Sequence, residues 1–337
     1  MKLPPFEYIL PKTMKKACQF LKEHKGRALA IAGGTDLVMA LKHRLKSPQA
    51  LIDLRTIPRL DRIDYATKSG LKIGALITLR HLAEHPAVNE KYPMLAQAAL
   101  SVGTPQLQAM GTVAGNLCQD NLCLYYHRSP LFRQMDAPCH KLGGKVCYAV
   151  PRSKTCWATY SGDLAPALLV LGAKIEIMDP AGERVWPLKK LYSGDGKKPN
   201  LLKPGQILTE IQVPSPLSLS RGVYLKLRVR KTIDYPLLGV AAHVTMRNGS
   251  EICADAALAM TGVEREPVMI EEAGRLRGTR ITDEDVDGLA EVAYKQAHPL
   301  SNVGELTPRY RKEMVKVYVK DAFQHILRDL DRQGGAA

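Results

Sequence analysis

The sequence predicts an α+β protein of two domains, and three observations support this fold class. The chain has 337 residues, enough for two domains of roughly 100–200 residues each. Within residues 220–330, expected strands are followed by expected helices, the order typical of an α+β domain. Pro214-Ser215-Pro216 and the Ser- and Leu-rich residues after it resemble a linker. We therefore expect domains at 1–218 and 219–337.

The expected elements of the first domain alternate between helix and strand. Apolar residues at helical spacing predict a helix from Thr13 to His24. The apolar run at 28–32 predicts a buried strand that ends at Gly33-Gly34. A helix capped by Thr35 or Asp36 is expected to follow. The other expected elements are strands at 51–54, 71–78, 174–178 and 207–213, helices at 94–100 and 164–171, and loops around Gly103, Pro105, Gly111 and Gly115.

The second domain is expected to begin with strands at 223–229, 238–246 and 254–260. Thr282 is placed to cap a helix that runs to about Ala297. Thr307-Pro308 combines an N-cap with proline at the first helical position and predicts a long final helix. Cys18 and Cys253 fall on expected core positions and are predicted to be structural.

Composition and charge narrow the class of protein. The chain is 45% hydrophobic and 24% charged, which excludes disordered and fibrous classes. It has no apolar run of the roughly 18–20 residues that span a bilayer and no apolar N-terminal signal, so we expect a cytoplasmic protein that does not bind membranes. The net charge of +15 favours a nucleic acid, a polyanionic ligand or an acidic electron-transfer protein as partner. No dense basic run is interleaved with aromatic residues, so nucleic acid is not expected.

Five of the seven cysteines lie in one stretch that is rich in Gly, Pro and basic residues. Without a secretory signal, clustered cysteines favour a metal or iron–sulfur site over disulfides. Only the interval between the first two cysteines is as short as in the cysteine pairs of zinc ribbons. A 4Fe–4S cube needs four thiolates, so one cysteine of the five would be surplus. Zinc and an iron–sulfur cluster both remain open at this point. Few periodic apolar residues occur at 118–160, which predicts an inserted loop. The five cysteines are Cys118, Cys123, Cys139, Cys147 and Cys156, separated by four, fifteen, seven and eight residues.

Two glycine-rich segments carry the other chemical signal. At Ala30–Leu37, a strand, a double-glycine turn and a helix start expose several backbone N–H groups at one point, as a phosphate cradle does. Met110–Cys118 offers a second glycine turn with a hydroxyl and an amide. Two such loops could hold the two ends of a long phosphate-bearing ligand, although unrelated structural turns would have the same pattern. Neither a Rossmann fingerprint nor a P-loop occurs in the chain.

Taken in this order, the two glycine-rich segments and the cysteine-rich stretch resemble the FAD-binding subunit of the molybdenum hydroxylases. This family includes the xanthine dehydrogenase and carbon monoxide dehydrogenase group. Residues 32–37 resemble the first FAD loop of that family and residues 111–116 the second. Gly162-Asp163-Leu164-Ala165-Pro166 is similar to the Ser-Asp-Leu-x-Pro motif of the family. The resemblance implies a two-part, PCMH-type FAD-binding domain with a cysteine-rich insert, followed by a small C-terminal α+β domain.

The resemblance also implies roles for individual residues. Ala30 to Leu37 would wrap the FAD pyrophosphate, Leu208 would pack on the isoalloxazine ring, and Lys226 would place positive charge near it. No catalytic acid–base pair is expected on this chain, because the cofactors carry the chemistry. The expected FAD-binding residues are Ala30, Ile31, Ala32, Gly33, Gly34, Thr35, Asp36, Leu37, Val102, Thr112, Val113, Ala114, Gly115, Asn116, Gln119, Asp163, Leu208 and Lys226.

The cysteine insert separates the second and third motifs and narrows the resemblance to one branch of the family. Residues 116–123, the later cysteines, and the segments 226–230 and 234–242 closely resemble the β subunits of 4-hydroxybenzoyl-CoA reductases. This implies a heterotrimer, expected to dimerise, in which partner subunits hold the molybdenum cofactor and two 2Fe–2S clusters, and a ferredoxin as electron donor. Cys118 would be the surplus thiol. The implied 4Fe–4S ligands are Cys123, Cys139, Cys147 and Cys156.

Two alternatives follow from the same sequence. Some aldehyde or N-heterocycle oxidoreductases of this family also carry a cluster in this loop, and electrons would then leave the substrate. This chain cannot distinguish the two directions, because the substrate pocket is expected on another subunit. The alternative of another class is a basic zinc-bound protein that binds nucleic acid. A visible spectrum with flavin and iron–sulfur bands would exclude that alternative.

Overall fold

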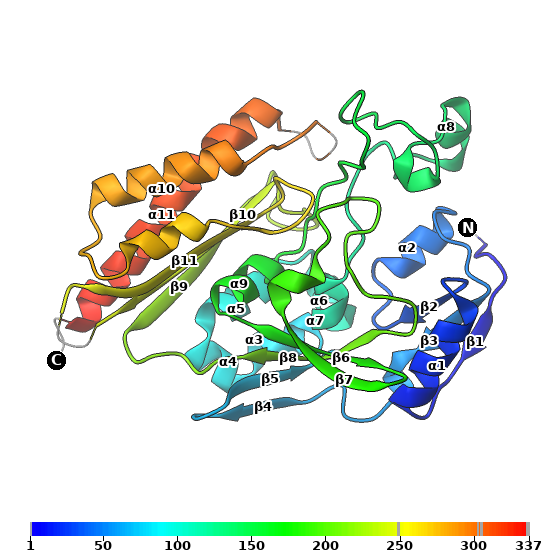
Figure 1. Ribbon diagram of the computed structural model, residues 1–337, viewed down its shortest axis with the longest axis horizontal. Helices are drawn as coiled ribbons and strands as arrows, with labels where there is room; N and C mark the ends of the chain where they lie inside the picture. Colours follow the sequence, from blue (N-terminus) through cyan, green and yellow to red (C-terminus); the bar gives the residue numbers. More distant parts are fainter. Residues whose placement is uncertain (1, 248–249, 302, 304–305, 335–337) are drawn as a thin grey trace.

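The computed structural model describes residues 2–247, 250–301, 303 and 306–334, which form three β-sheets with helices around them (Figure 1). The helices are α1 Met14–His24, α2 Leu37–Lys42, α3 Leu79–Glu84, α4 Pro86–Lys91, α5 Pro93–Leu100, α6 Pro105–Met110, α7 Val113–Leu117, α8 Pro130–Met135, α9 Leu164–Val170, α10 Asp283–Gln296 and α11 Pro308–Gly334. The strands are β1 Glu7–Ile9, β2 Ala28–Ile31, β3 Ala50–Asp53, β4 Ile63–Ala66, β5 Gly70–Gly74, β6 Lys174–Asp179, β7 Gly182–Pro187, β8 Ile207–Val213, β9 Ser220–Leu227, β10 Leu238–Met246, β11 Cys253–Thr261 and β12 Val268–Met269.

The N-terminal part is a small parallel sheet in the order β1-β3-β2, with α1 packed against it. The helix begins where the sequence predicts, because the Thr13 hydroxyl accepts a hydrogen bond from Lys16 N at 3.3 Å. Its buried residues are the predicted apolar positions Met14, Ala17, Cys18 and Leu21. This confirms that Cys18 is a core residue.

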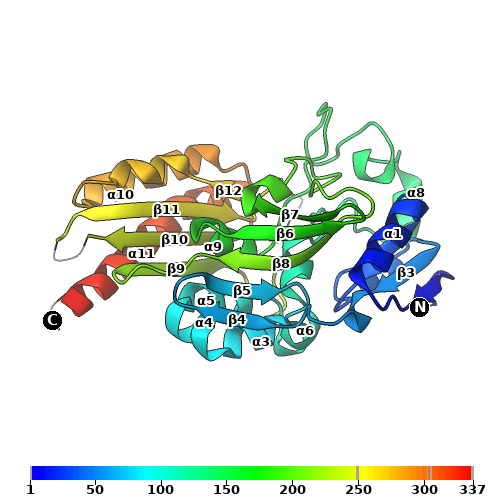
Figure 2. The same cartoon turned by 60° about the horizontal axis from the view of Figure 1, so that its bottom comes forward.

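The remaining sheets are antiparallel and run β4-β5-β8-β6-β7 and β12-β11-β10-β9. Helices α5 and α9 lie between them, so the largest hydrophobic core joins the five-stranded sheet to β9, β10 and β11. On its other face the four-stranded sheet is covered by α10 and α11 (Figure 2). Thr282 caps α10 in a reciprocal capping box with Asp285. Cys253 is fully buried in this second core, as predicted.

Two predictions about the first domain were wrong. The glycine-rich segment expected as loops contains the short helices α6 and α7. Each begins at a threonine whose hydroxyl accepts a backbone N–H, Thr104 from Leu107 and Thr112 from Gly115. These N-caps outweigh the glycines that follow them. The strand expected at 71–78 ends at Gly74, because Thr78 already caps α3.

The cysteine insert is largely irregular, as predicted, and its two ends are joined. Leu122 and Thr159 form an antiparallel bridge, each donating its N–H to the carbonyl of the other at 2.8 Å. Between them lie α8 and one 3₁₀ turn, His140–Leu142. Leu131, Phe132 and Met135 of α8 are exposed, so the insert buries few of its apolar residues.

A buried arginine ties the C-terminal helix to the four-stranded sheet. The side chain of Arg311, on α11, is fully buried and makes four hydrogen bonds to backbone carbonyls. Burial lowers its pKa to about 10, so the guanidinium keeps its charge at neutral pH. The acceptors are the carbonyls of Leu237, Leu300, Val303 and Gly262.

We expect Arg311→Met to lower the free energy of unfolding by about 3–5 kcal/mol, because it leaves several buried carbonyls without donors. Arg309→Met, two residues earlier on an exposed position of the same helix, should change it by less than about 0.5 kcal/mol. Urea unfolding of the full chain followed by circular dichroism measures both values. Equal stability of the two variants would show that the buried guanidinium contributes nothing to the fold.

Candidate functional site

The two glycine loops lie against each other in the structure. A Cβ on Gly33 would stand 1.7 Å from the carbonyl oxygen of Met110, so only glycine permits this approach. Gly34 adopts a left-handed φ of +73° at the turn from β2 into α2. The first hydrogen bond of that turn runs from Val38 N to Gly34 O at 2.9 Å, and the N–H groups before it have no partner within the helix. The first loop therefore presents backbone donors beside the second.

The second loop is fixed by α7 and by the motif that follows the insert. The Asn116 side chain is buried, and its Oδ1 accepts a hydrogen bond from Leu164 N at 3.1 Å. Leu164 is the first residue of α9, so this contact joins the loop at 111–116 to Gly162-Asp163-Leu164. All three motifs that the sequence singled out for FAD are thus brought together.

Asp163 and Lys226 form a buried ion pair that joins the two expected domains. Lys226 Nζ lies 3.0 Å from Asp163 Oδ1, and both side chains are less than 5% exposed. Lys226 also donates to Ser101 O, and Tyr224 OH donates to Asp163 Oδ1 at 2.7 Å. Burial raises the pKa of Asp163 and lowers that of Lys226, while each charge opposes the shift of the other. The positive charge predicted at position 226 is therefore balanced within the protein.

Buried polar atoms without a protein partner occur beside these motifs. Among the described residues, Gln119 Nε2 and Ser161 Oγ are buried and make no hydrogen bond. Gln119 Nε2 lies within 2.8 Å of the point that a Cβ on Gly162 would occupy, so the two groups are neighbours. Buried donors need acceptors, and FAD offers carbonyl and hydroxyl oxygens. The residues present therefore fit FAD, and Ser161, which no sequence motif marked, joins the predicted set.

The other predicted FAD residues differ in their exposure to solvent. Ala30 and Asp36 are exposed, whereas Leu208 is buried in the main core on β8. Desolvation by the surrounding protein, together with the charge of Asp120, raises the pKa of Asp36 to about 6. Asp36 in turn raises the pKa of Tyr235 beyond the effect of burial, which places a loop of the C-terminal domain near the first glycine loop. The sequence did not identify Tyr235 as a site residue.

Four of the five clustered cysteines line one cavity. Cys123, Cys139, Cys147 and Cys156 surround it together with Tyr125, Tyr126, Tyr148, His140, Lys141, Val146, Ala149 and Ala158. Backbone contacts hold these segments in place. The Cys139 carbonyl accepts the N–H of Gly144 at 2.9 Å, and the Cys156 carbonyl accepts that of Gly196 at 3.1 Å. In the part of the chain that the structure describes, no three His, Cys, Asp or Glu side chains are arranged to hold a single metal ion.

Cys118 lies outside this cavity. It follows α7 in the second glycine loop and packs against the main core. Burial raises the pKa of its thiol to about 12, so it is protonated at neutral pH. The structure thus separates the four cysteines that the resemblance assigned to a cluster from the one it left out.

Comparisons with known proteins match both halves of the chain. A family described as the FAD binding domain in molybdopterin dehydrogenase matches residues 4–216. A second, the CO dehydrogenase flavoprotein C-terminal domain, matches residues 223–326. Together these define a flavoprotein subunit of a multi-cofactor oxidoreductase. The chain belongs to the FAD-binding subunits of the molybdenum hydroxylase family, and its cofactor is FAD.

Individual relatives agree with this assignment. The FAD-binding subunit of an Escherichia coli aldehyde oxidoreductase is 33% identical over 72% of this chain and 77% of its own length. The carbon monoxide dehydrogenase medium chain of Afipia carboxidovorans is 28% identical over 95% of this chain and 96% of its own. A solved CO dehydrogenase from Oligotropha carboxidovorans superposes with a TM-score of 0.79 at 26% identity, covering 96% and 98% of the two chains. The fold predicted from the resemblance is confirmed.

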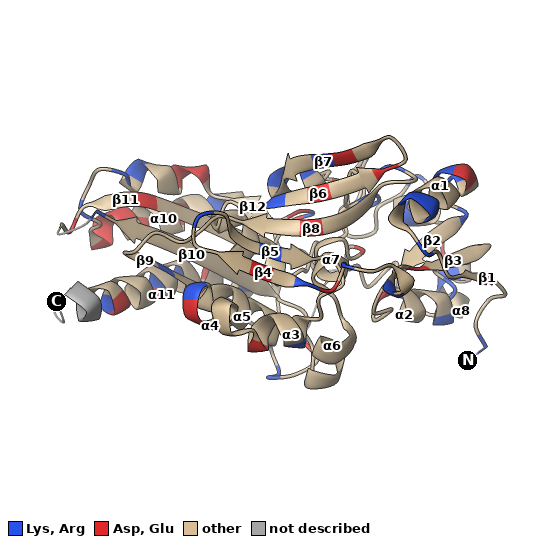
Figure 3. Ribbon diagram, turned by 90° about the horizontal axis from the view of Figure 1, so that it is seen from below, with Lys and Arg blue, Asp and Glu red and all other residues tan. Residues whose placement is uncertain are grey.

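Basic and acidic residues are mixed along several elements, whereas nucleic-acid binding favours a dense basic stretch. Over the described residues, Lys and Arg are interspersed with Asp and Glu along α10, α11 and the strands β6 to β8 (Figure 3). None of the described helices combines the length and the hydrophobicity that a bilayer span requires.

Proposed function

We propose that this chain carries FAD and a 4Fe–4S cluster and transfers electrons within a molybdenum hydroxylase complex. The observation that carries the proposal is the convergence of Cys123, Cys139, Cys147 and Cys156 on one cavity. Four thiols suit a 4Fe–4S cube. When bound, FAD exchanges electrons in pairs or singly and the cluster exchanges them singly.

The chain's own residues would bind and separate the two cofactors. The glycine loops would approach the FAD pyrophosphate through their backbone N–H groups. Gln119 and Ser161 would donate to FAD oxygens from buried positions. The ion pair of Asp163 and Lys226 would fix the C-terminal sheet against the flavin loops. The remaining FAD contacts are proposed as the resemblance gave them.

For the substrate of the complex, we propose 4-hydroxybenzoyl-CoA and its reductive dehydroxylation. The support is the close resemblance of residues 116–123, the later cysteines, and residues 226–230 and 234–242 to the β subunits of 4-hydroxybenzoyl-CoA reductases. An aldehyde oxidoreductase is the second candidate, because an aldehyde oxidoreductase subunit is 33% identical to this chain. In both cases the substrate would bind to a partner subunit that holds the molybdenum cofactor.

The proposed complex also contains a subunit with 2Fe–2S clusters, and the heterotrimer would dimerise. A medium chain among the relatives is named as one part of a larger carbon monoxide dehydrogenase. A ferredoxin is proposed as the electron donor, supported by the charge of +15. The domain boundary at 218/219 would fall in the loop between β8 and β9, and the complex would be cytoplasmic.

The substrate can be assigned with the complex purified without oxygen. The reductase reading predicts turnover of 4-hydroxybenzoyl-CoA when a reduced low-potential carrier is supplied, and no oxidation of aldehydes. Dye-linked oxidation of aldehydes without dehydroxylation would assign the complex to the second candidate instead.

This chain, purified alone, is expected to turn over neither an aryl-CoA nor an aldehyde, since no substrate site is assigned to it. Slow flavin-dependent reduction of a dye should remain, because all the predicted FAD-binding residues lie on this chain. Substrate turnover assays on the chain confirmed to be free of molybdenum check this. Turnover of either substrate would contradict the subunit assignment.

A further inference from the structure

A buried ammonium group lies beside the cysteine cavity. The side chain of Lys141 is only 3% exposed. Of the described residues that line the cavity, it is the one Lys or Arg. Burying a charge is costly unless polar partners surround it.

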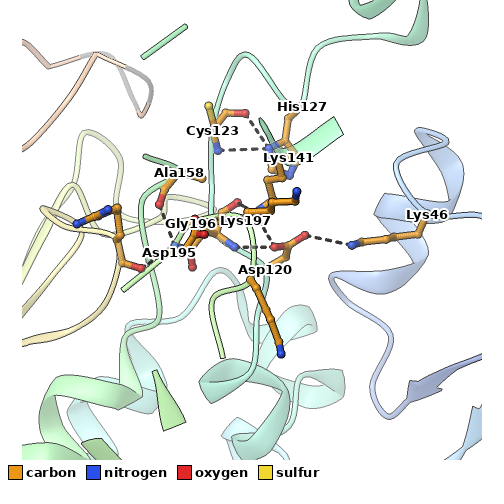
Figure 4. Close-up of polar contacts among 12 residues, drawn as sticks. Lys46, Asp120, Cys123, His127, Lys141, Ala158, Asp195, Gly196 and Lys197 are labelled. Carbon is orange, nitrogen blue, oxygen red and sulfur yellow. Dashed lines mark hydrogen bonds and ion pairs between the residues drawn. The ribbon is translucent and has the colours of Figure 1, made fainter. Parts of the chain in front are cut away.

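The three N–H donors of Lys141 are all used. Nζ lies 2.7 Å from Asp120 Oδ1, and it donates to Asn121 O at 3.1 Å and to Gly196 O at 2.7 Å. An ammonium has three donors, so this set saturates it. Figure 4 shows Lys141 between Asp120 and the Gly196 loop, with Cys123 close by. Lys141 thus connects the 3₁₀ turn His140–Leu142 to the start of the insert at Asp120 and Asn121, and to Gly196 outside the insert.

One of these partners, Asp120, is adjacent to a predicted FAD-binding residue. Asp120 directly follows Gln119, whose buried Nε2 has no partner among the described residues. Asp120 is also 3.8 Å from Lys46, beyond α2. On the cavity side, the ammonium stands 5.1 Å from the centroid of the Tyr126 ring. Lys141 and Cys156 line the same cavity.

We propose that Lys141 is the charge-compensating and positioning residue of the cysteine centre. This inference rests on the proposed 4Fe–4S function. The ammonium offsets part of the negative charge that four thiolates bring into the cavity, and its contacts hold the turn at 140–142 against Asp120 and Asn121 and against Gly196.

The positive charge of Lys141 affects the reduction potential of the proposed cluster. Net charge and hydrogen bonding around the ligands set the potentials of iron–sulfur clusters. A fixed cation in a poorly solvated place favours the more negative, reduced state. Lys141 therefore raises the potential of the centre, whereas its partner Asp120 lowers it.

The test compares variants of Lys141 with an exposed lysine of the same loop. Lys141→Met keeps most of the length of the side chain without its charge, and Lys141→Arg keeps the charge. Asp120→Asn removes the compensating carboxylate. Lys154→Met is the matched control, because Lys154 is exposed and does not line the cavity. Each full-length chain is prepared without oxygen, its iron and FAD are counted, and the cluster potential is measured by redox titration with electron paramagnetic resonance.

We expect the potential to fall in Lys141→Met, to rise in Asp120→Asn, and to stay near the wild-type value in Lys141→Arg and Lys154→Met. Loss of iron in Lys141→Met with rescue by arginine would also support a charge that the centre requires. An unchanged potential in an iron-loaded Lys141→Met chain, an equal shift in Lys154→Met, or equal loss of iron with methionine and arginine would overturn the inference. A wild-type chain without iron and sulfide would instead refute the proposed function.

Discussion

Serine in place of any one of Cys123, Cys139, Cys147 and Cys156 is expected to lower bound iron by about four atoms per chain, because a 4Fe–4S cube needs four thiolates. Cys118→Ser should leave iron unchanged, since Cys118 lies outside the shared cavity. Iron and acid-labile sulfide are counted on all five variants, prepared without oxygen.

The same four variants should lose order in the insert. Only four residues, two of them cysteines, form the buried cluster of this region, and the apolar residues of α8 are exposed. Ligation at four points restricts the chain much as cross-links do. Limited proteolysis should therefore cut the serine variants within 124–155, while FAD stays bound. If Cys118→Ser loses iron and Cys123→Ser keeps it, the ligand assignment is wrong.

Gly34→Asp is expected to cause the second large effect, loss of bound FAD with the fold and the iron retained. Its left-handed φ of +73° is one that Asp tolerates better than most residues. The new carboxylate would face the pyrophosphate. Two unit charges about 4 Å apart repel by about 1 kcal/mol in water and about 4 kcal/mol near a protein surface. FAD content after gel filtration and the FAD dissociation constant measure the loss.

Gly34→Asn is the matched control because it has nearly the same shape and backbone preference without the charge. Both side chains place a Cβ 3.2 Å from Val38 Cγ2, so this contact affects them alike. FAD should bind at least about fivefold more weakly to the Asp variant than to the Asn variant. Full FAD occupancy in Gly34→Asp would show that this loop does not hold the pyrophosphate.

Elements with strong local signals could be predicted from the sequence. The helix at Met14–His24 has both an amphipathic period and a threonine cap, and β8 and β10 match their predicted residues. Short elements were missed for two different reasons. The three residues of β1 form a strand only by pairing with β3, and α6 is marked by Thr104-Pro105 alone within a glycine-rich segment.

Some residues of the candidate site could likewise be predicted from the sequence, and others could not. The resemblance separated Cys118 from the other clustered cysteines, and the structure places these groups apart. By contrast, no sequence pattern marks the burial of Lys141, whose partners Asp120 and Gly196 are distant in sequence. Ser161 was missed for a similar reason, since its unpartnered hydroxyl becomes visible only when the motif at 162–166 folds against Gln119.

The most direct test of the central claim is a cofactor count on the wild-type chain, purified without oxygen. Flavin is measured by absorbance, iron and zinc by elemental analysis, and sulfide by its acid-labile release. A flavoprotein with a 4Fe–4S cluster predicts one FAD and about four iron and four sulfide per chain. A chain that holds stoichiometric zinc and no sulfide would contradict the account.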